Sequence, residues 1–169
     1  MNILETERLL IRQLSIDDAG FIIELLNDPS FIQNIGDRNV RTLEDAKAYV
    51  LNGPVASYAK NGFGLGLVIL KATGEPIGMC GLIKRDALED VDIGYAYLPR
   101  YWSKGYAIEA ALAMKSYAKE ACHLNRLVAI VDPANTSSIR VLEKLGMKFE
   151  RMVRLSQDDI ELKLFACSL

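Results

Sequence analysis

Residues 91–110 read V-D-I-G-Y-A-Y-L-P-R-Y-W-S-K-G-Y-A-I-E-A, an apolar run that passes through a short loop into an alanine-rich segment. The run predicts a β-strand over 91–98, and the alanines predict a helix over about 104–122. A helix that starts directly after a strand leaves its first N–H groups unpartnered, at the end where its dipole favours negative charge. Because Gly105 lacks a Cβ and Lys104 adds a positive charge, the loop is a candidate site for a pyrophosphate.

The same glycine has a simpler interpretation, in which Gly105 only permits a tight turn from strand to helix. The loop matches neither the G-x-G-x-x-G pattern nor the G-x-x-x-x-G-K-[ST] phosphate loop. A second glycine group at 62, 64 and 66 enters a strand rather than a helix, so we interpret it as part of a strand edge. The residues alone leave both interpretations of Gly105 open.

The segments around this stretch predict the rest of the fold. Three short apolar runs at 64–71, 76–84 and 91–98 indicate an antiparallel meander with tight turns. A strand at 126–131 follows the long helix, so this crossover makes one parallel pair. Further expected elements are a strand at 5–14, helices at 16–27, 43–52 and 136–145, and a final hairpin of 147–155 and 159–166. Together they predict an α+β fold, with a mixed, mostly antiparallel central sheet and flanking helices.

Local signals indicate where the helices begin, end and pack. Asp28-Pro29 is expected to stop the first helix, Thr42 and Asp45 form a capping box, and Asn135 caps the helix that Gly146 ends. The long helix carries many alanines, which allow its axis to approach a sheet closely. Its expected buried stripe consists of Ala107, Ala111, Met114, Ala118 and Ala121.

Composition bounds the class of protein. The 169 residues are 50% hydrophobic, which suits one globular domain over 1–169. The 20 basic and 22 acidic residues give a net charge of −2, which argues against nucleic acid or anionic lipid as a partner. Three scattered cysteines and one histidine favour reduced, buried thiols and no metal cluster. Charges near the N-terminus argue against a signal peptide or membrane span, so we expect a cytoplasmic protein.

Several motifs resemble those of one known family. W-S-K-G-Y-A at 102–107 is similar to the [QR]-x-x-G-x-[GA] pyrophosphate loop of the GCN5-related N-acetyltransferases, the GNAT family. Residues 91–110 more narrowly resemble the branch with the ribosomal-protein N-terminal acetyltransferases, as does N-T-S-S-I-R-V-L-E-K-L-G-M at 135–147. E-T-E-R-L-L-I-R at 5–12 and P-I-G-M-C-G-L at 76–82 resemble the first and third strands of that branch. The resemblance covers nearly the whole chain, in order.

The resemblance implies a GNAT acyl-CoA N-acyltransferase fold that binds acetyl-CoA. Its sheet would splay between the strands at 91–98 and 126–131, and the pantetheine arm would lie in that opening. The residues implied in cofactor binding are Ala96, Tyr97 and Leu98 beside the pantetheine, and Trp102, Ser103, Lys104, Gly105, Tyr106 and Ala107 around the pyrophosphate. Asn135 either caps its helix alone or also contacts the cofactor.

The implied reaction is direct attack of an amine on acetyl-CoA in a ternary complex. Positioning alone supplies roughly 7–11 kcal/mol in such reactions, so a strong acid is not essential. Leu142 stands where many members have a tyrosine acid, and Trp102 and Ser103 replace the usual start of the loop. By resemblance, a backbone N–H near Tyr97 would stabilise the oxyanion.

Two side chains are candidates for proton transfer. Asp92 stands where the branch often has a glutamate, and would take the amine proton, directly or through one water. It could equally be a solvated acid beside Glu89 and Asp90, or the partner of a strand lysine. Ser138 matches the serine of the branch and would bond the leaving thiolate, unless it only bonds its own helix backbone.

The acceptor would be a primary amine of a small molecule or of a peptide or protein N-terminus. Acidic residues near the expected acceptor side suit a cationic amine, or are ordinary solvated residues: Glu24, Asp28, Asp37 and Glu44. The tail lacks the N-G-x-W-type hairpin of the ribosomal-protein enzymes, which leaves the acceptor class open. A monomer or homodimer is expected. The alternative function is a non-catalytic acyl-CoA-binding sensor or regulatory module.

Overall fold

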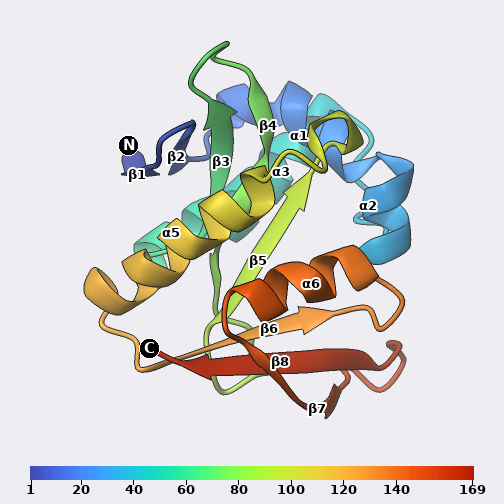
Figure 1. The fold of residues 1–169 in the computed structure, drawn as a ribbon. Coiled ribbons are helices and arrows are strands. Elements are labelled where there is room, and N and C mark those ends of the chain that lie inside the picture. Colours follow the sequence, from blue (N-terminus) through green and yellow to red (C-terminus); the bar gives the residue numbers. More distant parts are fainter.

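The computed structural model describes residues 1–169, which form one eight-stranded sheet in the order β1-β2-β3-β4-β5-β6-β8-β7 (Figure 1). The parallel pair is β5–β6, and every other neighbouring pair is antiparallel. The meander, the crossover and the mixed α+β class are therefore confirmed. The strands are β1 (Asn2–Glu5), β2 (Leu9–Gln13), β3 (Leu65–Leu70), β4 (Pro76–Ile83), β5 (Asp92–Tyr97), β6 (Arg126–Val131), β7 (Lys148–Val153) and β8 (Leu162–Ser168).

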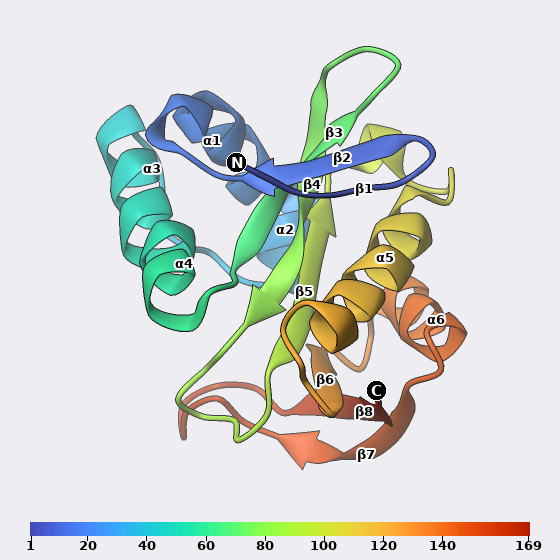
Figure 2. The same ribbon diagram turned by 90° about the vertical axis from the view of Figure 1, so that its left-hand side faces the viewer.

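The helices cover both faces of the sheet. Figure 2 shows α1, α3 and α4 on one side of the central strands and α5 on the other. None of the helices is both long enough and apolar enough to cross a membrane. The helices are α1 (Ala19–Leu26), α2 (Pro29–Asn34), α3 (Leu43–Val50), α4 (Ala56–Asn61), α5 (Tyr106–Glu120) and α6 (Thr136–Lys144), with short 3-10 turns η1 (Ile16–Asp18) and η3 (Pro99–Tyr101) and a π-type turn η2 (Leu51–Val55).

Each covered face has its own core. The larger cluster lies under α5, where Ala111, Met114 and Ala118 of the expected stripe are buried. Ala110 is also buried, whereas Ala121 is exposed because α5 ends at Glu120. The second cluster joins α1 and α3 to the opposite face of the sheet through residues such as Ile22, Leu26, Val50, Leu67 and Met79.

Several local predictions need correction. The strand expected at 5–14 begins only at Leu9, as β2, because residues 6–8 form the turn from β1, where the Thr6 hydroxyl accepts from the Leu9 N–H (3.0 Å). Pro29 stops α1 as expected but also begins α2, which the Asp28 side chain caps. The helical backbone continues through Pro54 by way of η2 into α4 rather than ending at residue 52. Of the three free cysteines, only Cys80 is buried.

The sheet divides between β5 and β6. These strands pair at a single position, Asp92 opposite Val128, where the Val128 N–H donates to the Val91 carbonyl (3.1 Å). Beyond that point the two strands diverge, as Figure 1 shows. The divergence leaves backbone groups of β5 without strand partners on that side, close to where the chain enters α5.

Candidate active site

The loop between β5 and α5 presents a run of free backbone donors. None of the N–H groups from Ser103 through Ile108 donates a hydrogen bond to another group of the chain, and no side chain caps α5. Ser103 (φ 60°) and Gly105 (φ 82°) are both left-handed, a conformation that curls successive N–H groups into an anion-binding nest. The loop is exposed. Both its geometry and the helix dipole therefore suit a pyrophosphate, and Gly105 is needed for its positive φ.

The backbone of β5 shows which groups face the opening. Leu98 donates its N–H to Ile77 of β4 (3.1 Å), and its carbonyl accepts from Tyr101 (3.0 Å), so both its groups are engaged. Backbone direction alternates along a strand, so Ala96, which pairs with Met79, also faces β4. Tyr95 and Tyr97 therefore direct their backbone groups toward β6. Of the three residues expected to pair with pantetheine, only Tyr97 has its backbone groups at the opening.

Trp102 lies over this part of β5. Its indole Nε1–H donates to the Tyr97 carbonyl (2.8 Å), while 46% of the residue stays exposed. The Tyr97 side chain points the other way, into the core under α5, and its hydroxyl has no hydrogen-bond partner. Tyr97 can therefore act at the opening through its backbone, not through its phenol.

A tyrosine and a serine meet at the start of α6. Asn135 caps α6 by accepting from the Ser138 N–H (3.2 Å), as expected, and leaves the Ser138 hydroxyl free for other partners. That hydroxyl lies 2.9 Å from the Tyr95 Oη. Burial raises the pKa of Tyr95 to about 12, while the hydrogen bond with Ser138 opposes the rise. Tyr95 is thus a protonated donor at neutral pH, and Leu142, at the usual tyrosine position, is fully buried.

Asp92 is buried rather than solvated. Only 1% of the residue is exposed, so Asp92 is not a solvated acid. Its Oδ2 forms an ion pair with the Arg85 Nε (2.8 Å), so its cationic partner is an arginine and not a strand lysine. The Asp92 Oδ1 has no hydrogen-bond partner. Burial raises the pKa of this carboxyl, and Arg85 opposes the rise. A carboxylate oxygen with unused lone pairs therefore lies where β5 and β6 meet.

The four acidic residues considered for an amine substrate all have partners within the chain. Glu24 pairs with Arg100, Asp37 with Arg41, and Glu44 with Lys47, while Asp28 caps α2. These contacts favour the interpretation as ordinary surface residues. They do not form a free acidic patch for a cationic acceptor.

Sequence reasoning missed two contacts at the site. One is the contact of Tyr95 with Ser138, because a strand tyrosine carries no local sign that it will reach a serine 43 positions later. Sequence reasoning also missed Arg8 and Glu109, whose ion pair (2.7 Å) joins the β1–β2 turn to α5 across 101 positions. Only the E-T-E-R motif and the glutamate after the loop could have drawn attention to that pair.

The comparisons with known proteins agree with this geometry. The family described as "Acetyltransferase (GNAT) domain" matches residues 8–148. The Bacillus subtilis (strain 168) protein named Uncharacterized N-acetyltransferase YnaD is 34% identical over 145 residues, which cover 86% of this chain and 82% of that protein. The solved GNAT-family acetyltransferase from Bacillus anthracis is 29% identical, with a TM-score of 0.81 and coverage of 99% and 98%.

A more distant structure shows the same fold. It is the ribosomal L7/L12 α-N-protein acetyltransferase RimL in complex with coenzyme A, with a TM-score of 0.85 at 15% identity and coverage of 100% and 98%. The fold expected from the sequence motifs is thus confirmed, and GNAT folds bind acyl-CoA. The chain belongs to the GNAT family and is an N-acetyltransferase.

Proposed function

We propose that this protein transfers the acetyl group of acetyl-CoA to a primary amine of a small molecule or of a peptide or protein N-terminus. The observation that carries the proposal is the run of unpartnered N–H groups from Ser103 through Ile108, beside the opening between β5 and β6. This nest fits a pyrophosphate, and the opening fits an extended arm that pairs with β5. Both are parts of coenzyme A.

The reaction would be a direct transfer in a ternary complex. Acetyl-CoA supplies an activated acyl group, held as a thioester. The amine nitrogen bonds to the acyl carbon, the carbon–sulfur bond breaks, and the amine proton must leave while the sulfur is stabilised or protonated. The chain therefore needs a donor for the carbonyl oxygen, an acceptor on the amine side and a donor on the sulfur side.

The backbone of β5 would orient the cofactor. Tyr95 and Tyr97 direct their N–H and carbonyl groups into the opening, where an extended amide chain can complete a strand-like ladder. The Tyr97 N–H is the proposed donor to the carbonyl oxygen of the thioester. Trp102 now bonds the Tyr97 carbonyl, so we expect its indole to move when an arm pairs there. Asn135 would keep its capping bond and add a contact to the cofactor.

Ser138 is the proposed donor to the leaving sulfur. Tyr95, whose high pKa keeps its proton, can donate to the Ser138 Oγ, so that the serine proton points outward. This pair would replace the tyrosine acid that Leu142 cannot provide. A hydroxyl that stabilises a thiolate is sufficient here, because a thiolate is already a good leaving group.

Asp92 is the proposed acceptor of the amine proton, through one water. It lies on the opposite face of β5 from Tyr95, at the closed end of the opening, where β5 pairs with β6. Its free Oδ1 can accept a proton, and the raised pKa makes the carboxylate a better base. The burial of Asp92 is also the observation that favours the second candidate, a non-catalytic acyl-CoA sensor, since a covered carboxylate contacts no acceptor directly.

The first test is calorimetric titration of acetyl-CoA against the unmodified protein and Gly105→Glu. The new carboxylate would repel phosphate and strain a residue at φ 82°, so we expect micromolar binding to weaken at least about 100-fold. Gly74→Glu is the matched control, because Gly74 also has positive φ (74°) with open space around it, in the β3–β4 turn.

The outcomes separate the two functions. Binding that Gly74→Glu retains and Gly105→Glu loses, with all three proteins folded by circular dichroism, supports the cofactor site. Release of CoA thiol with a panel of amines then identifies an enzyme, whereas binding without thioester consumption identifies a sensor. No binding of acetyl-CoA to the unmodified protein would overturn both.

A further inference from the structure

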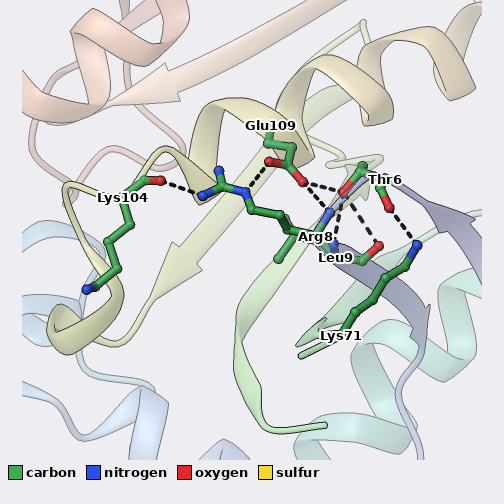
Figure 3. A network of polar contacts seen from close by, with 6 residues as sticks. All are labelled: Thr6, Arg8, Leu9, Lys71, Lys104 and Glu109. Atoms are coloured by element: carbon green, nitrogen blue, oxygen red, sulfur yellow. Dashed lines mark hydrogen bonds and ion pairs between the residues drawn. The ribbon is translucent and has the colours of Figure 1, made fainter. Parts of the chain in front are cut away.

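One glutamate joins the β1–β2 turn to the first turn of α5. Figure 3 shows the Glu109 carboxylate between Thr6 and Arg8: its Oε2 accepts from the Thr6 hydroxyl (2.5 Å) and the Arg8 N–H (3.0 Å), and its Oε1 accepts from the Arg8 Nε (2.7 Å). Both carboxylate oxygens are therefore engaged, and the Arg8 side chain is held in one orientation. The Arg8 guanidinium also lies over the Tyr106 ring, 4.5 Å from its centroid.

The same arginine reaches into the pyrophosphate loop. Its Nη1 donates to the Lys104 carbonyl (3.0 Å), and its Nη2 lies 3.3 Å from where a Cβ on Gly105 would be. The Lys104–Gly105 peptide is planar and trans, so its carbonyl and its N–H point in opposite directions. By fixing the Lys104 carbonyl, Arg8 therefore directs the Gly105 N–H away from itself.

We propose that Arg8, held by Glu109, is a positioning residue for the cofactor loop: it sets the Lys104–Gly105 peptide so that the Gly105 N–H belongs to the anion-binding nest. This inference rests on the proposed function and adds to it a residue outside the loop motif. The left-handed backbone at Ser103 needs such support, because a residue with a side chain adopts positive φ only at a cost and this exposed loop gains little from its own packing.

Two other roles for Arg8 make different predictions. If Arg8 formed only a surface ion pair, it would contribute little to the stability of the fold and nothing to cofactor binding. A direct phosphate ligand would act through its charge, so that lysine could replace it. The peptide geometry argues against direct contact, since the bonded carbonyl places Arg8 on the side of this peptide opposite the Gly105 N–H. In the proposed role lysine cannot replace Arg8, because an ammonium lacks the planar set of N–H groups with which the guanidinium bonds both Glu109 and the Lys104 carbonyl.

The test compares Arg8→Gln, Arg8→Lys and the unmodified protein by calorimetric titration with coenzyme A. We expect both variants to bind roughly tenfold more weakly, the effect of losing one charge-assisted hydrogen bond. Arg154→Gln, which breaks the exposed Arg154–Glu161 pair on the β7–β8 hairpin, is the control and should bind normally. Full rescue by Arg8→Lys would overturn the positioning role.

A second readout separates positioning from general loss of structure. S-acetylpantetheine lacks the pyrophosphate, so turnover with it should be equal in Arg8→Gln and the unmodified protein, while KM for acetyl-CoA rises and kcat changes little. The double variant Glu109→Gln with Arg8→Gln should weaken coenzyme A binding by much less than the sum of the free-energy losses in the two single variants. Coenzyme A binding that is unchanged in Arg8→Gln overturns this inference alone, whereas no binding to the unmodified protein overturns the proposed function as well.

Discussion

Two carboxylate–guanidinium pairs of similar geometry lie in different parts of the molecule. Arg8–Glu109 (2.7 Å) supports the loop, and Arg85–Asp92 (2.8 Å) lies where β5 and β6 meet. The Glu109 side chain is 20% exposed and all its lone-pair partners come from the β1–β2 turn, whereas Asp92 is 1% exposed with one oxygen unpartnered. The two pairs therefore have nearly the same distance but different environments.

The two environments shift the carboxyl pKa values in opposite directions. Burial acts to raise the pKa of Glu109, but hydrogen bonds from Thr6 and Arg8 outweigh it, and the pKa lies below its ordinary value. Burial raises the pKa of Asp92, and the opposing effects of Arg85 and Lys84 do not offset it. An arginine is present in both pairs, so the opposite shifts follow from the deeper burial of Asp92 and from the larger number of donors to Glu109. The opposite shifts also suit the proposed roles, in which an ionised Glu109 holds Arg8 in place and Asp92 accepts a proton.

The largest expected difference between the pairs is in the cost of removing the arginine. Arg85→Met leaves Asp92 buried without a cation and should lower the free energy of unfolding by about 3–5 kcal/mol. Arg8→Met should cost only about 1 kcal/mol, because Arg8 is 41% exposed and Glu109 keeps its bonds to Thr6 and the Arg8 N–H. Urea unfolding at neutral pH measures both. Equal losses would show that burial does not distinguish the pairs.

A smaller effect should appear in the pH dependence of stability. The lowered pKa of Glu109 gives stability that is present above the unfolded pKa of about 4.3 and lost as pH falls through the lower folded pKa. The raised pKa of Asp92 has the opposite sign: its contribution is present below about pH 3.9 and lost as pH rises through the higher folded pKa.

Glu109→Gln and Asp92→Asn, compared with the unmodified protein by urea unfolding from pH 3 to 7, test these signs. The loss of unfolding free energy caused by Glu109→Gln should grow as pH rises. The unfolding free energy of Asp92→Asn, relative to that of the unmodified protein, should instead increase as pH rises. Slopes of the same sign would contradict the assignment of opposite pKa shifts.

The smallest expected effect concerns the hydroxyl that makes Glu109 different. Thr6→Val keeps the shape of the side chain but removes a donor to Glu109 and the acceptor of the Leu9 N–H, at a cost of about 1 kcal/mol in thermal or urea unfolding. It should also move the pKa of Glu109 upward, toward that of a carboxyl with fewer donors. Thr6→Ser, which keeps the hydroxyl, is the control and should change the pKa little.

Much of the fold followed from local patterns. The meander, the long helix, the Asn135 cap and the final hairpin depend on periodicity, turn residues and capping, which act over a few residues. One error fell where a distant contact decides: the strand expected from residue 5 begins only at Leu9, because residues 6–8 form a turn that Glu109 also holds.

The site shows the same division. The loop at 102–107 could be predicted as an anion site because unpartnered helical N–H groups and a glycine are local properties. The residues of β5 that face the opening could not be predicted, because their direction depends on how β5 pairs with β4. The backbone groups of Leu98 are bonded within the chain, whereas those of Tyr95 face β6. The pairing of Asp92 with Arg85 and of Tyr95 with Ser138 likewise depends on which segments the fold brings together.

By itself, then, the sequence determined the order of the elements, the family and the position of the proposed cofactor loop, because motifs and periodicities express the conformational preferences of neighbouring residues. Only the tertiary structure decided the burial of Asp92, the contact between Tyr95 and Ser138 and the support of the loop by Arg8. Those properties arise from desolvation and from hydrogen bonds between residues up to 103 positions apart, and no local pattern encodes them.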